Sequence, residues 1–224
     1  MQAMGIRVVA VDVGSVRPPS RFAWAAFAPP AREAIMSGND PRSAVSAVVG
    51  GLAWGGQAAL LLESPLAVPV PAGQPDGWRL LGKARAGEGN RAWSAGAGAG
   101  VLATGLAQGA WMLSQLAADI PGLAATTQPD QWQAGAAPLL LAEAFVSGSG
   151  KPAPGSAGQD AADAEAAGLA LVDLLNASAP LASSICCSPH APFNLLAAMA
   201  VWAGLGIDPS ELSLDVLVIT AQPR

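Results

Sequence analysis

Hydrophobic positions in the N-terminal part of the chain form short continuous runs separated by polar turns. Residues 7–13 are rich in valine and are followed by Gly14, which predicts a central strand buried on both faces. Residues 21–27 predict a second strand, antiparallel to the first across a short connection. A third short strand is expected near residues 34–37. The chain is therefore expected to begin with an antiparallel sheet.

Further along, apolar runs alternate with segments at helical spacing. Asp40 and Pro41 predict the start of a helix that ends near Gly55. Two further apolar runs, residues 58–63 and 138–146, predict buried strands. The later predictions are helices over about 96–116, 159–176 and 192–203 and an edge strand over 214–220. This alternation predicts an α/β fold with a mixed sheet of about five strands and helices on both faces.

The length of the chain fits one domain. Its 224 residues, 52% of them hydrophobic, can bury a single core, so we expect one domain over residues 1–224. Residues 65–94 are rich in proline, glycine and arginine and are expected to form an insertion or extended loop. Whether the protein forms a homodimer stays open.

A cytoplasmic location without membrane insertion is expected. No apolar stretch reaches the roughly 18 uninterrupted residues that a membrane span needs. Asp12 interrupts the first apolar run, so the N-terminus lacks the pattern of an export signal. The two cysteines, Cys186 and Cys187, are neighbours and fit a reducing compartment. Together with the single histidine, His190, they are expected to be structural because their spacing is poor for zinc.

The charge of the chain limits how it meets nucleic acid. A net charge of −5 argues against binding through bulk electrostatics. Basic residues nevertheless gather between residues 79 and 91, where a flexible loop is able to contact phosphates, although solvated basic loops are equally common. An aromatic residue that follows could stack on a base. The candidate substrate-binding residues are Lys83, Arg85, Arg91 and Trp93.

Carboxylates recur at the predicted strand ends although charged residues make up only 12% of the chain. Asp12, Glu63 and Glu143 each lie in or at the end of an apolar strand candidate. The carboxyl ends of neighbouring parallel strands converge on one crevice, so Asp12 and Glu63 are expected to lie close together. Asp160 and Asp163, three residues apart on a predicted helix, project from nearly the same face and could complete the cluster.

Such a cluster is suited to divalent cations. Mg²⁺ and Mn²⁺ prefer oxygen ligands, and a pair of such ions can stabilise the attacking and leaving oxygens of phosphodiester cleavage. A purely structural role is also open for each acid, because carboxylates are favoured as turn caps, near helix N-termini and on solvent-exposed surfaces. The candidate metal ligands are Asp12, Glu63, Asp163 and Glu143. The candidate catalytic residues are Asp12, Glu63, Asp160 and Asp163.

The order of these motifs resembles the ribonuclease-H-like superfamily. A first-strand acid in Val-Asp12-Val-Gly14 is followed by a hairpin, a helix, a strand ending at Glu63 and a late helix bearing acids. The segment from Asp160 to Asp163 also resembles the late-helix motif of Holliday-junction resolvases. The whole pattern resembles an uncharacterised family of predicted nucleases that carries a glutamate at the position of Glu143. The resemblance implies a ribonuclease-H-like sheet whose first-strand, fourth-strand and late-helix acids bind catalytic metals.

The leading hypothesis is a divalent-metal-dependent phosphodiester hydrolase, a nuclease acting on DNA or RNA with water as the nucleophile. A second hypothesis is a non-catalytic binding or scaffold protein that retains the fold, with structural acids. A third is a relative of the sugar-kinase and actin ATPase superfamily, because Asp12-Val-Gly14 also resembles its first phosphate loop. Metal binding separates the first hypothesis from the second.

Overall fold

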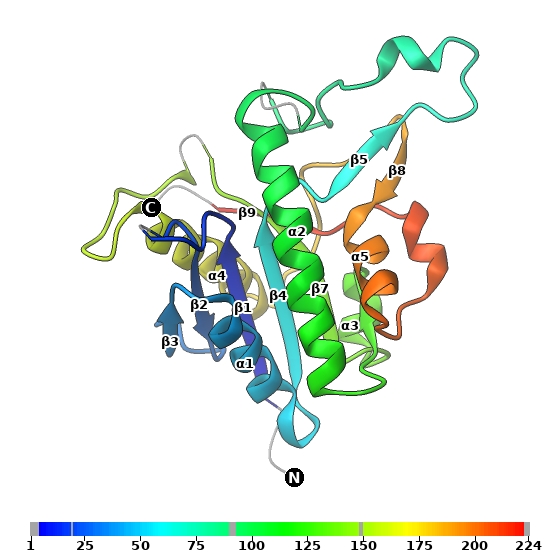
Figure 1. Ribbon diagram of the computed structural model, residues 1–224. Coiled ribbons are helices and arrows are strands. Elements are labelled where there is room, and N and C mark those ends of the chain that lie inside the picture. The colour runs from blue at the N-terminus through cyan, green and yellow to red at the C-terminus, as the bar shows by residue number, and fades with distance from the viewer. Residues whose placement is uncertain (1–4, 19, 90–92, 148–149, 222–224) are drawn as a thin grey trace.

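A computed structural model describes residues 5–18, 20–89, 93–147 and 150–221 of the chain (Figure 1). Within these residues the main sheet has seven strands. Across the sheet they are β3 (Met36–Gly38), β2 (Ala23–Phe27), β1 (Ile6–Asp12), β4 (Gln57–Glu63), β7 (Leu139–Phe145) and β6 (Ala125–Thr126), with β9 (Val218–Thr220) also pairing with β7. Strand β2 pairs antiparallel with both β1 and β3, whereas β1, β4, β7, β6 and β9 pair in parallel.

The predicted fold class is confirmed, with more strands than expected. The hairpin of β1 and β2 and the parallel placement of β4 beside β1 have the predicted arrangement. Strand β6 has only two residues and was too short to be signalled by hydrophobic periodicity. The resulting mixed sheet is compatible with a ribonuclease-H-like fold.

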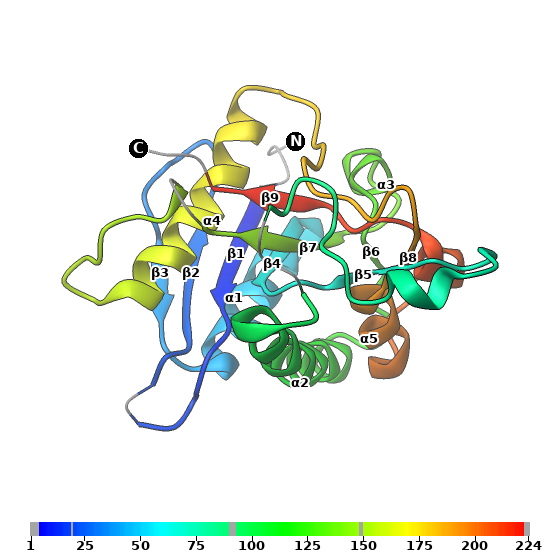
Figure 2. The same cartoon turned by 90° about the horizontal axis from the view of Figure 1, so that it is seen from above.

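Helices cover both faces of the sheet (Figure 2). The helices α1 (Pro41–Leu52), α2 (Gly96–Asp119) and α5 (Leu195–Ala203) lie on one face, and α4 (Gln159–Asn176) lies on the other. Strand side chains alternate between these faces. Val9 and Val11 of β1 join the core beneath α1 and α2, whereas Val8 and Ala10 join the core beneath α4. Asp12 continues the second series and therefore faces α4.

The start of α1 follows the predicted capping pattern. Asp40 is the N-cap, and its carboxylate accepts a hydrogen bond of 2.8 Å from the backbone N–H of Ser43. Pro41 occupies the first turn, where its missing N–H costs no hydrogen bond. The helix extends to Leu52 and is followed by the short 3-10 helix η1 (Ala53–Gly55), so the predicted end near Gly55 lies within a few residues of the observed one.

The segment 65–94 contains more regular structure than an extended loop. Strand β5 (Ala67–Val70) pairs antiparallel with β8 (Ala191–Asn194) in a separate two-stranded sheet. A 3-10 helix, η2 (Gly77–Leu80), follows, and this part of the chain projects away from the main sheet (Figure 1). The segment is thus tied to a strand more than 100 residues later in sequence.

Two other predictions are corrected in the C-terminal part. Residues 192–194 belong to β8, and α5 begins at Leu195 because the Asn194 side chain caps it by accepting a hydrogen bond from the N–H of Ala197. The late strand is confined to β9, because residues 214–217 are irregular and follow the 3-10 helix η4 (Pro209–Ser213). The short helix α3 (Pro129–Gln133) was not predicted. No helix in the described ranges is both long and apolar enough to cross a membrane.

Candidate metal centre

Three of the predicted acids meet at the carboxyl ends of the central strands. Asp12 and Glu63 are the last residues of β1 and β4 and are direct partners in their parallel register. Asp163, near the start of α4, approaches them from the covering helix. One carboxylate oxygen of each residue lies within 4.8 Å of the others. The prediction that Asp12, Glu63 and Asp163 lie close together is confirmed.

The turn that follows β1 fixes the position of Asp12. Gly14 packs so closely on the returning chain that an added Cβ would lie 2.2 Å from the carbonyl oxygen of Arg21. The N–H of Arg21 donates to the carbonyl of Ser15 at 2.7 Å. The Gln108 side chain, from α2, donates to the Gly14 carbonyl. The glycine after the first-strand acid is therefore required by this close approach of two backbone segments.

Asp163 is held from both sides of its carboxylate. Lys151 Nζ lies 2.8 Å from Oδ2, and Gln159 Nε2 donates to Oδ1 at 2.6 Å. The Asp163 side chain is only 4% exposed, whereas that of Lys151 is 43% exposed. Neither Lys151 nor Gln159 was singled out from the sequence. The only signal was that Lys151 is one of two lysines in the chain and precedes the acidic helix.

Burial and the neighbouring acids raise the proton affinity of Asp12. Burial raises the pKa of Asp12 to about 8, with the negative charges of Asp160 and Asp163 acting in the same direction and Lys151 opposing them. Asp160 is half-buried in the first turn of α4. It is outside the group of three that meet within 4.8 Å, but its charge is felt at Asp12. The prediction that Asp160 adjoins the cluster agrees with this electrostatic effect.

The donor set fits a hard divalent cation. All three central ligands offer carboxylate oxygens, which Mg²⁺ and Mn²⁺ prefer. A cation among them would also offset the repulsion and burial that raise the pKa of Asp12. Asp12, Glu63 and Asp163 are therefore the residues that would hold the metal.

Glu143 is not part of this centre, contrary to its prediction as a metal ligand. In the β4–β7 register its partner is Leu62 and not Glu63, and Leu62 faces the core beneath α2. An offset of one residue turns a strand side chain to the opposite face of the sheet. Glu143 therefore lies behind the acids, where Leu66 N–H donates to its Oε2 at 2.8 Å.

Arg85 is the partner of Glu143 and not a surface residue, which corrects its prediction as a phosphate contact. Its guanidinium donates to both oxygens of Glu143 at 2.7 Å, and it also pairs with Glu88 at 3.2 Å. The side chains of Arg85 and Glu143 are each 1% exposed. Burial alone would lower the pKa of Arg85, but these ion pairs raise it above its ordinary value. The arginine thus anchors the 65–94 segment to the main sheet.

Of the other predicted substrate-binding residues, Lys83 and Trp93 lie in the described part of the 65–94 segment, whose surface is less basic than predicted. Lys83 is exposed, and Trp93 is half-buried with its indole N–H donating to the carbonyl of Lys83 at 2.9 Å. The guanidinium of Arg79 lies over the Trp78 ring, 5.0 Å from its centroid. Arg91 lies outside the described residues. Without Arg85, this surface carries less positive charge than the sequence suggested.

The cysteines have the surroundings of structural residues. Cys187 is buried, and burial together with the negative charge of Asp215 raises the pKa of its thiol to about 12. The thiol is therefore protonated and unreactive near neutral pH. The Nδ1 atom of His190 lies 3.4 Å from the side-chain nitrogen of Gln74.

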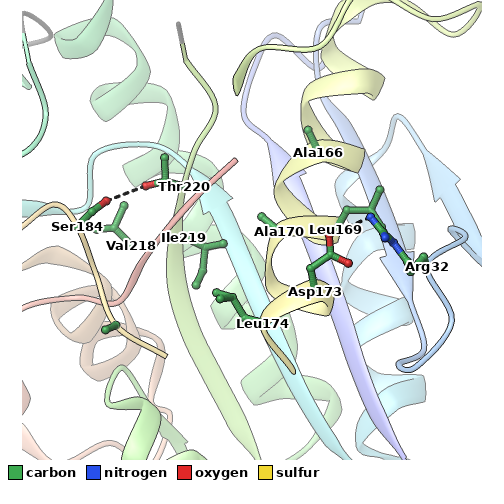
Figure 3. Close-up of a pocket in the computed structure, with 11 residues that line it drawn as sticks. Arg32, Ala166, Leu169, Ala170, Asp173, Leu174, Ser184, Val218, Ile219 and Thr220 are labelled. Carbon is green, nitrogen blue, oxygen red and sulfur yellow. Dashed lines mark hydrogen bonds and ion pairs between the residues drawn. The ribbon is translucent and has the colours of Figure 1, made fainter. Parts of the chain in front are cut away.

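A pocket lies elsewhere on the molecule, between α4 and β9 (Figure 3). It has a volume of about 560 Å³ and is lined mainly by apolar side chains such as Leu169, Leu174 and Ile219. Its charged groups, Arg32 and Asp173, pair with each other at 3.0 Å. None of the three acids of the candidate metal centre lines this pocket.

Comparisons of this chain with models of protein families, with curated proteins and with solved structures found no match.

Proposed function

We propose that this protein is a divalent-metal-dependent phosphodiester hydrolase that acts on nucleic acid. The observation that carries the proposal is the convergence of Asp12, Glu63 and Asp163 within 4.8 Å at the carboxyl ends of two parallel strands. The arrangement costs stability, because burial and the charges of Asp160 and Asp163 disfavour the ionised form of Asp12. Sites that carry such a cost are commonly functional.

In the proposed reaction the protein supplies ligands, orientation and a proton acceptor. Asp12, Glu63 and Asp163 would hold Mg²⁺ or Mn²⁺, which when bound activates water and offsets charge on the phosphate. Gln159 fixes the orientation of Asp163 through its bond to Oδ1. Asp160, beside the three ligands, would accept the proton that water loses.

Space for substrate adjoins Asp160. Asp160 lines a cavity of about 270 Å³ whose walls also include Ser20, Ser37 and Asn39. These neutral polar side chains suit contacts to sugar and phosphate oxygens, which position a nucleic acid without reading its sequence. Lys83 and Trp93 of the 65–94 segment would provide more distant contacts.

The proposal is tested first by calorimetric titration of Mn²⁺ into the wild type and into Asp12→Asn, Glu63→Gln and Asp163→Asn. The matched control is Glu165→Gln, which removes one negative charge from an exposed position of the same helix. We expect the wild type and the control to bind Mn²⁺ equally and each site variant to bind at least about tenfold more weakly.

Hydrolysis is then measured on bis(p-nitrophenyl) phosphate, single-stranded and duplex DNA, RNA and a four-way DNA junction. Activity that requires Mn²⁺ or Mg²⁺ and is lost in Asp12→Asn supports the proposal. Metal binding without hydrolysis of any of these phosphodiesters would contradict it. Absence of metal binding would favour a non-catalytic binding or scaffold protein with structural acids.

A further inference from the structure

Lys151 acts on more acids of the candidate metal centre than the one with which it forms an ion pair. Its Nζ lies 2.8 Å from Oδ2 of Asp163, and its positive charge also acts on Asp12 and Glu63. The side chain enters from solvent, because it is 43% exposed while Asp163 is 4% exposed.

The backbone around Lys151 is held on both sides. Gly150 packs against the end of β9, where an added Cβ would lie 2.1 Å from the carbonyl oxygen of Ala221. The carbonyl of Pro152 accepts a hydrogen bond of 3.1 Å from Gln159, the same side chain that holds Asp163. Gln159 therefore sets the lysine backbone and the aspartate carboxylate relative to each other.

The geometry points to Lys151 as a phosphate-binding residue of this site, paired with Asp163 while no divalent cation is bound and transferred to the substrate phosphate when one is. This inference rests on the proposed function. A divalent cation held by Asp163 takes over the neutralisation that Lys151 provides, and the two cations repel each other. The long flexible side chain can then turn outward while the backbone stays in place.

The location of Lys151 suits an incoming phosphodiester. A substrate approaching the acids from solvent meets the half-exposed side chain of Lys151 before it meets the buried carboxylate of Asp163. Three carboxylates around one divalent cation keep a net negative charge, so the positive charge of Lys151 favours the approach of a phosphate. Lys151 also donates in several directions, which fits a phosphate with several oxygens.

The test compares Lys151→Met, which keeps the length of the side chain without its charge, and Lys151→Arg. The control is Arg32→Met, which removes the exposed partner of Asp173 at the other end of α4. Mn²⁺ affinity is measured by calorimetry. Phosphate binding is measured with dimethyl phosphate, an inert phosphodiester, through the paramagnetic relaxation of its phosphorus by protein-bound Mn²⁺.

We expect Lys151→Met to bind Mn²⁺ at least as tightly as the wild type but dimethyl phosphate about tenfold more weakly, the usual loss for one charged hydrogen bond. Lys151→Arg should retain most of the phosphate affinity, and Arg32→Met should match the wild type in both measurements. Unchanged phosphate binding in Lys151→Met would overturn the inference. Weakened Mn²⁺ binding in that variant would also overturn it, because Lys151 would then only build the site.

The outcomes separate this inference from the proposed function. Lys151-dependent phosphate binding without hydrolysis of any phosphodiester would contradict the hydrolase proposal alone. Hydrolysis with phosphate binding that is insensitive to Lys151 would contradict the role of Lys151 alone. Failure of the wild type to bind Mn²⁺ would overturn both. Thermal unfolding of each variant checks that it is folded.

Discussion

Asp12 and Glu63 are direct partners in the parallel register of β1 and β4, so their side chains leave the sheet at the same end and on the same face. Two carboxylates in this relationship repel each other, and α4 adds Asp163 from above. The fold thus places Asp12 where burial and neighbouring negative charges disfavour its ionised form.

Asp12→Asn should stabilise the metal-free protein, by an amount that grows with pH. Burial is the main cause that raises the folded-state pKa of Asp12 to about 8, from an ordinary value of 3.8. Its contribution to stability is therefore full below pH 3.8 and is lost as the pH rises toward 8. Asparagine does not titrate, so the stability difference between variant and wild type should increase over this range and then level off. Urea unfolding in EDTA at several pH values measures it.

Asp173→Asn is the control for that experiment, because Asp173 lies on the same helix in an exposed pair with Arg32. Its stability difference from the wild type should not grow between pH 4 and 8 in the manner expected for Asp12→Asn. A constant difference for Asp12→Asn across this range would show that Asp12 ionises normally in the folded protein. Added Mn²⁺ should reverse the order, stabilising the wild type but not Asp12→Asn.

Gln159→Leu should weaken Mn²⁺ binding while leaving the three carboxylates in place. Gln159 holds Oδ1 of Asp163 at 2.6 Å and the Pro152 carbonyl at 3.1 Å. Loss of a residue that orients a metal ligand typically lowers metal affinity by about 10–100-fold. Calorimetry with Mn²⁺ measures the effect, and Gln115→Leu on the exposed surface of α2 is the control. Equal Mn²⁺ affinity in wild type and Gln159→Leu would show that Asp163 needs no such support.

The sequence was sufficient to predict the acids that lie on elements with clear periodicity. Asp12 and Glu63 end strongly apolar strands, and Asp163 lies three residues after Asp160 on a helix, so their meeting followed from the rules of parallel sheets. Glu143 looked equivalent from its own strand. Its face depends on the register between β4 and β7, where it opposes Leu62, and no local pattern contains that information.

Residues whose role depends on distant partners could not be predicted. Arg85 lies in a segment whose composition is typical of a solvated loop, and its burial depends on Glu143, which is 58 residues away. Lys151 lies in a glycine-rich and proline-rich connection, so its approach to Asp163 depends on how that connection folds back over α4. Long-range ion pairs of this kind leave no periodic trace in a sequence.

Arg85→Met should strongly destabilise the protein. The substitution leaves Glu143 buried without the two 2.7 Å hydrogen bonds from Arg85, and breaking a buried pair typically costs about 3–5 kcal/mol. The double variant Arg85→Met/Glu143→Leu should lose less than the sum of the single variants, because Glu143 no longer leaves an unpaired buried charge and only Glu88 has lost its partner. Urea unfolding measures all three. Arg79→Met, whose pair with Asp76 is exposed, should change the free energy of unfolding by at most about 1 kcal/mol.

Gly14→Ala should destabilise the protein and weaken Mn²⁺ binding together. The added Cβ would lie 2.2 Å from the carbonyl oxygen of Arg21, so the turn after β1 has to move, at a cost of about 1–3 kcal/mol. Asp12 is two residues away, and a displacement of about 1 Å is enough to disturb a site whose groups must be aligned. Gly50→Ala is the control, because an added Cβ meets nothing within 4 Å there and alanine favours the α1 helix. If Gly14→Ala matched Gly50→Ala in unfolding and in Mn²⁺ affinity, the close approach of Gly14 to Arg21 would not be what positions Asp12.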